Sequence, residues 1–353
     1  MIPAAPSANE LEPRFAALAY GFESGAFNLP RNGRALFLGA RRACVLQLPR
    51  LNWLCEQSFK PHADALQESG FPVGSPEPGE TFALVLVLPP RQRDEARATL
   101  ARALLHCAPG GTVAAAMANA EGARTGETDL RRLAGASLRS LSKHKCRVFW
   151  AERREVDMDA ALLSQWLALD AVRPIDDGRY MSRPGLFAWN RIDAASALLA
   201  SHLPDTLSGR VADLGAGYGY LAAHVVEHCP NVTTIDLYEA DARALEPAHL
   251  NLARTAREIS VGVHWHDVTS GLPHRYDAIV SNPPFHLGRA DQPELGRAFI
   301  RTAAQALLPH GEFWLVANRH LPYEATLNEV FSKSQIITED AGFKVICARE
   351  PRL

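Results

Sequence analysis

The sequence predicts an α/β fold made of two tandem domains, each built on an open sheet of parallel strands in the doubly wound manner. Two observations point to this class. In the second half of the chain, four apolar runs typical of buried strands each end in glycines or polar residues. The first half repeats part of the same order of strands, turns and helices. A chain of 353 residues is also long for one globular unit and comfortable for two.

The first half carries the repeat most clearly between residues 82 and 119. Residues 82–87 predict a strand, residues 94–106 predict a helix, and a second strand ends at Ala118-Asn119. Residues 277–318 follow the same plan, with a Pro-Pro pair after the first strand in both copies. A repeat at half-chain spacing indicates duplication of a whole domain, because solenoid repeats have far shorter periods.

The first copy lacks residues that the second copy retains. Leu88 precedes its Pro-Pro pair where the second copy has Asn282, and an apolar side chain cannot orient an amino group as an amide can. Residues 35–41 stand where a glycine loop belongs, but they keep only Gly39. We therefore expect a degenerate first domain and an active second domain.

The join between the domains is expected near residues 171–178 (Ala-Val-Arg-Pro-Ile-Asp-Asp-Gly), a stretch rich in turn formers. This places the first domain at residues 1–175, with a role in RNA or substrate binding and in structure. The catalytic domain is then residues 176–353.

Positive charge is concentrated in residues 131–154, which contain eight Lys or Arg against one acid. His144, Phe149 and Trp150 are interleaved among them, a pattern that suits phosphate contacts and stacking on unpaired bases. A solvated basic face beside a buried strand at 148–150 explains the segment equally well.

A glycine loop follows the first strand of the second half. Residues 211–219 (Val-Ala-Asp-Leu-Gly-Ala-Gly-Tyr-Gly) predict a strand that runs into the loop, and residues 221–226 predict a helix after it. Gly215, Gly217 and Gly219 allow positive φ and close approach of a ligand to the backbone. The free amides at the helix start favour a carboxylate or a phosphate.

The next two strands end in acids. The strand at 233–238 leads to Glu239, and an acid at this place in a doubly wound fold can accept the hydroxyls of a ribose. Asp236 is the local competitor, but it lies within the apolar run, so we prefer Glu239. The strand at 261–265 leads to Asp267, which is suited to bond an adenine amino group.

The fourth strand, residues 277–280, is followed by Ser281-Asn282-Pro283-Pro284-Phe285. Two prolines fix φ and remove two donors, so the Asn282 amide and the Pro283 carbonyl are held as fixed groups. Phe285 offers an apolar face for a stacked ring. Taken alone, the motif could be an ordinary Pro-Pro turn. Because ligands bind outside the carboxyl ends of parallel strands, all four strand ends are expected to meet in one crevice.

These motifs resemble the Rossmann-like class I S-adenosylmethionine-dependent methyltransferases, and within them the amino-methylating group with an Asn-Pro-Pro-aromatic motif. A nicotinamide dehydrogenase would carry G-x-G-x-x-G in place of the loop that begins at Gly215. The resemblance implies S-adenosyl-L-methionine as the cofactor. It assigns the methionine part to Asp213, Gly215, Gly217 and Gly219, the ribose to Glu239, the adenine to Asp267, and the acceptor base to Asn282, Pro283 and Phe285.

The two-domain plan and the sequence from Asn282 to His286 resemble the bacterial ribosomal RNA guanine-N2 methyltransferases, especially the small-subunit enzyme. Residues 183–187 (Arg-Pro-Gly-Leu-Phe) resemble that family's entry segment, which implies that Phe187 lies near the cofactor. Residues 318–323 and 343–345 also match its pattern. Residues 193–196 (Asp-Ala-Ala-Ser) depart from the family's usual Asp-x-Gly-Ser.

The resemblance implies in-line methyl transfer to the exocyclic N2 of a guanine in 16S ribosomal RNA. The Asn282 side-chain oxygen and the Pro283 carbonyl would accept the two N–H bonds of the amine. No strong general base is required, because the methylated ammonium is acidic. His286 is a candidate general base, but its position after the aromatic residue equally suits a role in shaping the pocket. The residues expected to contact the substrate are Pro284, Phe285, His286 and Arg319, and Asn282 is expected to border the cofactor as well.

Composition limits the remaining classes. Apolar residues make up 47% of the chain without a run long enough to cross a bilayer, and no signal-peptide pattern is present. We expect a cytoplasmic monomer without a membrane partner. The six scattered cysteines are expected to be structural thiols, and His264 and His266 lack a third ligand, so no metal is expected.

Other functions remain open. A large-subunit (23S) guanine-N2 methyltransferase shares many of these motifs. An adenine methyltransferase or a protein glutamine methyltransferase uses equivalent chemistry at Asn-Pro-Pro. A non-catalytic RNA-binding assembly protein is the alternative of a different class, and it is disfavoured because the second copy keeps the residues that the first has lost.

Overall fold

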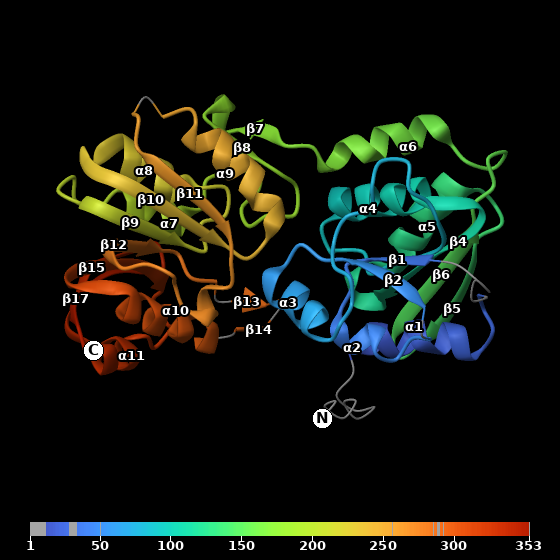
Figure 1. Cartoon of the computed structure of the whole chain (residues 1–353), viewed down its shortest axis with the longest axis horizontal. Coiled ribbons are helices and arrows are strands. Elements are labelled where there is room, and N and C mark those ends of the chain that lie inside the picture. Colours follow the sequence, from blue (N-terminus) through green and yellow to red (C-terminus); the bar gives the residue numbers. More distant parts are fainter. Residues whose placement is uncertain are drawn as a thin grey trace. The chain divides into compact units, whose positions relative to one another are not determined.

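The computed structural model describes residues 12–27, 34–49, 51–255, 257–284, 286–287, 290–291 and 293–352. Two compact units divide the chain, unit 1 (Met1–Ala171) and unit 2 (Val172–Leu353), and each contains its own hydrophobic clusters (Figure 1). The division lies at the start of the turn-rich stretch 171–178, just before the boundary expected from the sequence.

Unit 2 is built on a seven-stranded sheet. In sheet order the strands are β11 (Ser260–Trp265), β10 (Asn231–Glu239), β9 (Ser208–Leu214), β12 (Tyr276–Ser281), β15 (Leu307–Asn318), β17 (Phe343–Pro351) and β16 (Phe331–Asp340). Neighbours from β11 to β15 are parallel. β17 pairs antiparallel with both β15 and β16, so the sheet is mixed. The expectation of a parallel sheet is wrong at this edge, because β16 and β17 form a hairpin that turns back beside β15.

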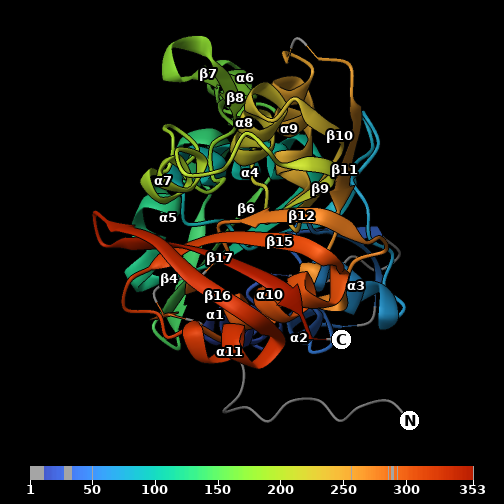
Figure 2. The same cartoon turned by 90° about the vertical axis from the view of Figure 1, so that its left-hand side faces the viewer.

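Helices cover both faces of this sheet, as Figure 2 shows. The helices of unit 2 are α7 (Ala194–Ala200), α8 (Tyr220–His228), α9 (Leu245–Leu252), α10 (Pro293–Ala306) and α11 (Glu324–Val330), with short 3-10 turns η3 (Asp176–Gly178), η4 (Ala242–Ala244) and η5 (Val268–Ser270). Val211 and Val280 pack with α7, α8 and α9 on one face. Leu214 and Ile279 pack with α10 and α11 on the other. Burial on both faces explains why these strands are continuous apolar runs in the sequence.

Two small hairpins complete unit 2. β7 (Arg173–Ile175) pairs with β8 (Tyr180–Ser182), and β13 (His286–Leu287) pairs with β14 (Ala290–Asp291). The second hairpin follows the Asn-Pro-Pro segment directly, so its backbone continues from the predicted acceptor site.

Unit 1 contains a six-stranded sheet. Its strands, in sheet order, are β2 (Asn52–Glu56), β1 (Arg34–Leu38), β3 (Phe82–Val87), β4 (Cys107–Ala118), β6 (Cys146–Glu152) and β5 (Arg139–Lys143). Its helices are α1 (Pro13–Glu23), α2 (Arg42–Val45), α3 (Lys60–Glu68), α4 (Arg93–Leu105), α5 (Ala123–Ala134) and α6 (Ala160–Leu167), with 3-10 turns η1 (Asn119–Glu121) and η2 (Ala168–Asp170). The strands predicted at 82–87 and before Asn119 are confirmed, as is the helix between them.

The two sheets share one strand order, except that unit 1 has no counterpart of β11 among its described strands. β4 and β15 have the same succession of buried and exposed positions along twelve residues. Both pair with the preceding strand through the same irregularity in register, after Phe82 in unit 1 and after Tyr276 in unit 2. The N–H of Gly39 donates to the carbonyl of Glu56 (3.0 Å), as the N–H of Gly215 donates to that of Tyr238 (2.9 Å).

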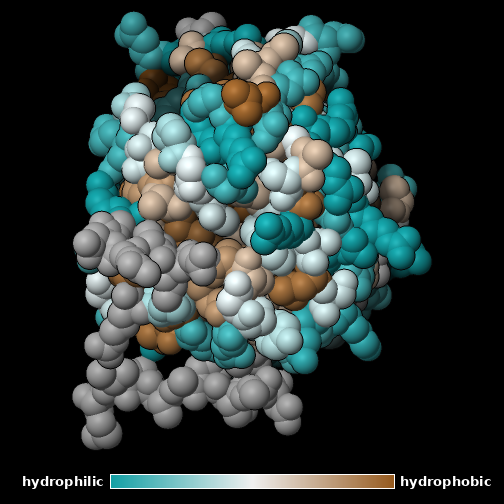
Figure 3. Space-filling view, turned by 90° about the vertical axis from the view of Figure 1, so that its right-hand side faces the viewer, coloured by the Kyte–Doolittle hydropathy of each residue, from teal (hydrophilic) through white to brown (hydrophobic). Residues whose placement is uncertain are grey.

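The basic segment 131–154 spans the end of α5 and the β5–β6 hairpin, and much of its charge is engaged within unit 1. The arginines with acidic partners are Arg131 and Arg147 on Glu127, Arg153 on Glu155, and Arg154 on Glu152. Arg139, His144 and Lys145 are exposed, the last two at the turn between β5 and β6. Figure 3 shows one face of unit 1, where hydrophilic residues surround smaller hydrophobic areas.

All six cysteines are buried free thiols. None of the helices in the described ranges combines the length and the apolarity needed to cross a bilayer.

Candidate active site

The ends of β9, β10 and β12 meet at one edge of the unit 2 sheet. In the pairing register, Leu214 at the end of β9 is matched by Ser281 on one side and by Tyr238 on the other. The Ser281 hydroxyl donates to the Leu214 carbonyl (2.8 Å) and ties the two strand ends together. A Cβ added to Gly215 would lie 3.8 Å from Cδ of Pro284. The glycine loop and the Asn-Pro-Pro segment are therefore direct neighbours.

The glycine loop has the backbone geometry that its composition predicts. Gly215, Gly217 and Gly219 have φ values of +71°, +53° and +84°, a region that side chains disfavour. A Cβ at Gly217 would meet no atom within 4 Å, so the space in front of this residue is open to a ligand. Gly219 is the N-cap of α8, whose first amides lie beside the loop.

Asp213, the residue before the loop, is only 1% exposed. Its Oδ2 accepts the N–H of Ala222 in α8 (3.0 Å), while its Oδ1 has no hydrogen-bond partner within the described residues. Burial, and to a lesser degree the nearby Glu239 carboxylate, raises the pKa of Asp213 to about 7, although the Ala222 bond opposes the shift. An orphaned carboxylate oxygen beside a glycine loop is suited to a cationic ligand.

Glu239 stands at the end of β10 and faces the same loop. Its Oε2 accepts the N–H of Gly217 and its Oε1 accepts that of Asp241, both at 2.8 Å. Burial raises its pKa, while the bonds from Asp241 and Gly217 act in the opposite direction. Each oxygen keeps a second lone pair, so the backbone holds the carboxylate ready to accept hydroxyl groups.

Asp236, the competitor for a ribose contact, is engaged elsewhere. It is 3% exposed and accepts hydrogen bonds from Arg210 (2.8 Å), His264 (3.0 Å) and the Tyr276 hydroxyl (3.2 Å). Burial raises its pKa, but the bonds from His264 and Arg210 outweigh burial and hold it below its usual value. This network stabilises the sheet and leaves Glu239 as the carboxylate beside the loop.

Asp267 lies beyond the end of β11 as the N-cap of η5. Its Oδ1 accepts both the N–H (2.9 Å) and the hydroxyl (2.7 Å) of Thr269. The Trp265 indole donates to the Ala240 carbonyl (2.8 Å), which links the ends of β11 and β10. The turn η5 thus fixes the Asp267 carboxylate close to the ends of β10 and β11.

Asn282 follows β12, and its side-chain nitrogen is fully engaged. Nδ2 donates to Oδ2 of Asp193 (3.0 Å) and to Oγ of Ser196 (2.8 Å). Asp193 and Ser196 belong to the start of α7, more than eighty residues earlier in the chain. Sequence reasoning missed both residues as partners of Asn282; the only signal was that residues 193–196 partly match a family motif.

The rest of the Asn-Pro-Pro motif is described in part. Pro283 is buried and Pro284 is exposed. Phe285 lies outside the described residues. His286 is described only by its backbone, as the first residue of β13. The predictions for Phe285 and for the His286 side chain therefore remain predictions.

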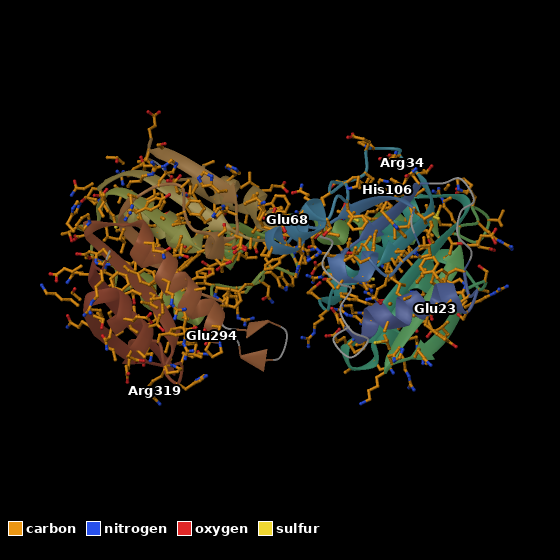
Figure 4. All side chains as sticks on the ribbon, turned by 60° about the horizontal axis from the view of Figure 1, so that its bottom comes forward. Glu23, Arg34, Glu68, His106, Glu294 and Arg319 are labelled. Atoms are coloured by element: carbon orange, nitrogen blue, oxygen red, sulfur yellow. The ribbon has the colours of Figure 1, made fainter. Side chains whose placement is uncertain are left out.

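Phe187 and Arg319 were predicted from the family resemblance, and both are exposed. Phe187 is 63% exposed, an unusual state for a large apolar side chain, so its ring is accessible for stacking. Arg319 follows β15 and lies at the surface of unit 2 (Figure 4). Its N–H donates to the Gly342 carbonyl (2.9 Å), which fixes the backbone at that strand end.

The residues present fit S-adenosylmethionine. The open glycine loop, the orphaned Asp213 oxygen and the oriented Glu239 carboxylate offer space, a negative charge and hydroxyl acceptors at one edge. Within the described ranges, no three His, Cys, Asp or Glu side chains are grouped so as to hold a metal ion.

Comparison with known proteins gives consistent findings. The family model for the methyltransferase small domain matches residues 177–347. Ribosomal RNA small subunit methyltransferase C of Psychromonas ingrahamii is 31% identical over 270 residues, which cover 76% of each chain. The protein of the same name from Klebsiella pneumoniae is 37% identical over 171 residues, about half of each chain.

A solved structure is similar over almost the whole length. The T. thermophilus 16S rRNA N2 G1207 methyltransferase in complex with AdoMet and guanosine is 25% identical, with a TM-score of 0.80 over 97% of this chain and 93% of that one. Together with the row of strand ends, this similarity defines an α/β methyltransferase. The chain belongs to the ribosomal RNA small subunit methyltransferase C family.

Proposed function

We propose that this protein transfers a methyl group from S-adenosylmethionine to the exocyclic N2 of a guanine in 16S ribosomal RNA. The observation that carries the proposal is the placement of Asn282, whose Nδ2 is held by Asp193 and Ser196 beside the glycine loop. With the nitrogen engaged, Oδ1 is the atom that remains to accept an amine N–H. The T. thermophilus relative, a 16S rRNA N2 methyltransferase described with AdoMet and guanosine, supports this choice of cofactor and base.

Each strand end takes one part of the cofactor in this proposal. The cofactor supplies an electrophilic methyl group on a sulfonium. The residues that hold it are Phe187, Asp213, Gly215, Gly217, Gly219, Glu239 and Asp267, and Asn282 borders it from the acceptor side. The Asp213 charge is placed to favour a cation, and the Glu239 oxygens are placed to accept ribose hydroxyls.

The acceptor base is held by the Asn-Pro-Pro-Phe segment. The Asn282 Oδ1 and the Pro283 carbonyl accept the two amine N–H bonds, which orients the nitrogen lone pair and stabilises the positive charge that develops on it. Phe285 stacks on the base after it leaves the RNA stack. Pro284, His286 and Arg319 complete the substrate side, with Arg319 available for a phosphate.

The first domain, residues 1–175, is proposed to be a degenerate duplicate of the catalytic domain, residues 176–353. The shared strand order and register support a common origin. Gly39 and Gly215 donate matching backbone hydrogen bonds, to Glu56 and Tyr238, so the two domains can be aligned on these pairs. In this alignment Gln57 stands at the position of Glu239, and Phe37 stands at the position of Asp213. The first copy has thus lost its cofactor carboxylates and is left with a structural and RNA-binding role.

The exposed basic tip of the β5–β6 hairpin is the part of the first domain that best suits an RNA phosphate. The substrate is then ribosomal RNA, within the small ribosomal subunit. We propose that the enzyme works as a cytoplasmic monomer.

Transfer of a labelled methyl group tests this function. Unmodified small subunits, large subunits and a release factor are each incubated with the protein and labelled S-adenosylmethionine, and the labelled product is identified by mass spectrometry. The proposal expects N2-methylguanosine from the small subunit. Label confined to the large subunit would select a 23S enzyme, and label on the release factor would select a glutamine methyltransferase; either result overturns the proposal.

A further inference from the structure

The Asn282 amide has two orientations that differ by exchange of its nitrogen and its oxygen, and only one of them is useful for methyl transfer. With Oδ1 toward the acceptor pocket, the amide accepts a hydrogen bond from the amine. With Nδ2 toward the pocket, two donors would oppose each other. Something in the protein has to select the first orientation.

The surroundings of Nδ2 make this selection. The Asp193 carboxylate accepts hydrogen bonds and donates none, so it attracts Nδ2 at 3.0 Å and would repel Oδ1 in the flipped amide. The hydroxyl of Ser196, a residue 9% exposed, lies 2.8 Å from the same nitrogen. The two acceptors together use both N–H bonds of the amide.

Asp193 is itself held rigidly. As the N-cap of α7, its Oδ2 also accepts the Ser196 N–H at 2.9 Å. One carboxylate oxygen therefore links the start of α7 to the residue that follows β12. A negative charge behind the amide also polarises it, which strengthens Oδ1 as an acceptor when positive charge develops on the amine.

We propose that Asp193 and Ser196 are positioning residues that fix the Asn282 amide with its oxygen toward the acceptor amine. This inference rests on the proposed function for its catalytic consequence, whereas the amide orientation itself does not depend on it. The segment 193–196 thus acts on the acceptor side of the site rather than on the cofactor.

Graded substitutions test the proposal. Asp193→Ser keeps an N-cap but is too short to reach Asn282, so kcat should fall roughly 10- to 100-fold. Asp193→Asn keeps an uncharged acceptor, so its kcat should fall less than that of Asp193→Ser. Ser196→Ala removes one neutral acceptor without touching the cap, and should lower kcat by about 3- to 10-fold. The Kd for S-adenosylmethionine and the KM for RNA should stay near the wild-type values in all three.

A matched control separates positioning from helix capping. Asp159 is the N-cap of α6 in unit 1 and accepts the Leu162 N–H at 2.9 Å. Asp159→Ser should leave kcat unchanged. Placing Asp193→Ser in an Asn282→Ala background should cause no further loss, because Asp193 acts through Asn282. Cofactor affinity that weakens in step with kcat, or an additive double variant, would overturn the inference.

A spectroscopic measurement keeps this inference separate from the proposed activity. The Asn282 side-chain NH2 signals are assigned by ¹⁵N NMR through their loss in Asn282→Ala. They should exchange slowly with water in the wild type and faster in Asp193→Ser. Equal exchange in both proteins would refute the positioning role. Absence of methyl transfer by the wild type, with the NMR difference present, would refute the proposed function alone.

Discussion

The buried carboxylate of Asp213 makes the ligand-free protein less stable as the pH rises, and replacing it with asparagine should remove this dependence. The raised pKa of Asp213, about 7 against an ordinary value of 3.8, means that the folded protein binds this proton more tightly than the unfolded chain does. The free energy of unfolding therefore falls as the pH rises between these two values and is level above them. A difference of about 3 pKa units corresponds to about 4 kcal/mol.

Asp213→Asn removes this pH-dependent contribution. The new side chain can still accept the Ala222 N–H, and its NH2 group then occupies the site of the unpartnered Oδ1. Near pH 4 the wild-type carboxyl is protonated and its own O–H lacks a partner at the same site, so the two proteins should then differ in stability by less than about 1 kcal/mol. Near pH 8 the variant should be more stable than the wild type by up to about 4 kcal/mol, because it has no carboxylate to bury.

Urea unfolding of both proteins at a series of pH values measures the difference directly. All other titrating groups are shared, so their contributions cancel in the comparison. A stability difference that stays constant between pH 4 and pH 8 would refute the reasoning, as would an Asp213 carboxyl whose pKa in ¹³C NMR lies near the ordinary value of an aspartate. A bound cationic cofactor should lower this pKa, so the affinity for S-adenosylmethionine should rise with pH up to about 7.

Two further substitutions test other parts of unit 2. Glu239→Gln places an NH2 group against one of the two backbone N–H groups that now donate to the carboxylate. The substitution should weaken S-adenosylmethionine binding by about 1–3 kcal/mol in isothermal titration. An unchanged Kd would remove Glu239 from the cofactor site. Gly296→Ala adds a Cβ that would lie 1.9 Å from the buried Tyr323 hydroxyl, so it should lower stability by about 1–3 kcal/mol in thermal unfolding despite the better helix propensity of alanine. A Tm equal to or above that of the wild type would contradict that packing.

The central strands could be predicted because their sequence signal is local. β3 and β12 are buried on both faces, so each is a continuous apolar run, and the predicted spans agree with the observed ones within a residue. β2 and β16 were not predicted. β2 alternates between exposed and buried positions, and β16 is an exposed edge strand with many polar residues, so neither produces such a run.

The residues of the candidate site also divide into those with a local sequence signal and those without one. The glycine loop, Glu239 and Asn282 are each recognisable within a few residues of a strand end, because strand ends of a parallel sheet share one edge. The bonds from Asn282 to the start of α7 join residues that are far apart in the chain, and no local pattern predicts them. The basic segment shows the opposite limit. Its composition indicates phosphate contacts, but Arg147 pairs with Glu127, an acid 20 residues away in the chain that only the fold brings close.

The role of Asn282 on the acceptor side, distinct from the cofactor, is the central claim, and Asn282→Ala tests it most directly. Methyl transfer to small subunits and S-adenosylmethionine affinity are measured on the same preparation of the variant. We expect kcat to fall by on the order of 100-fold or more while the Kd for the cofactor changes by less than about threefold, because the side chain acts on the amine in the transition state. Loss of cofactor binding in proportion to the loss of activity would contradict the account.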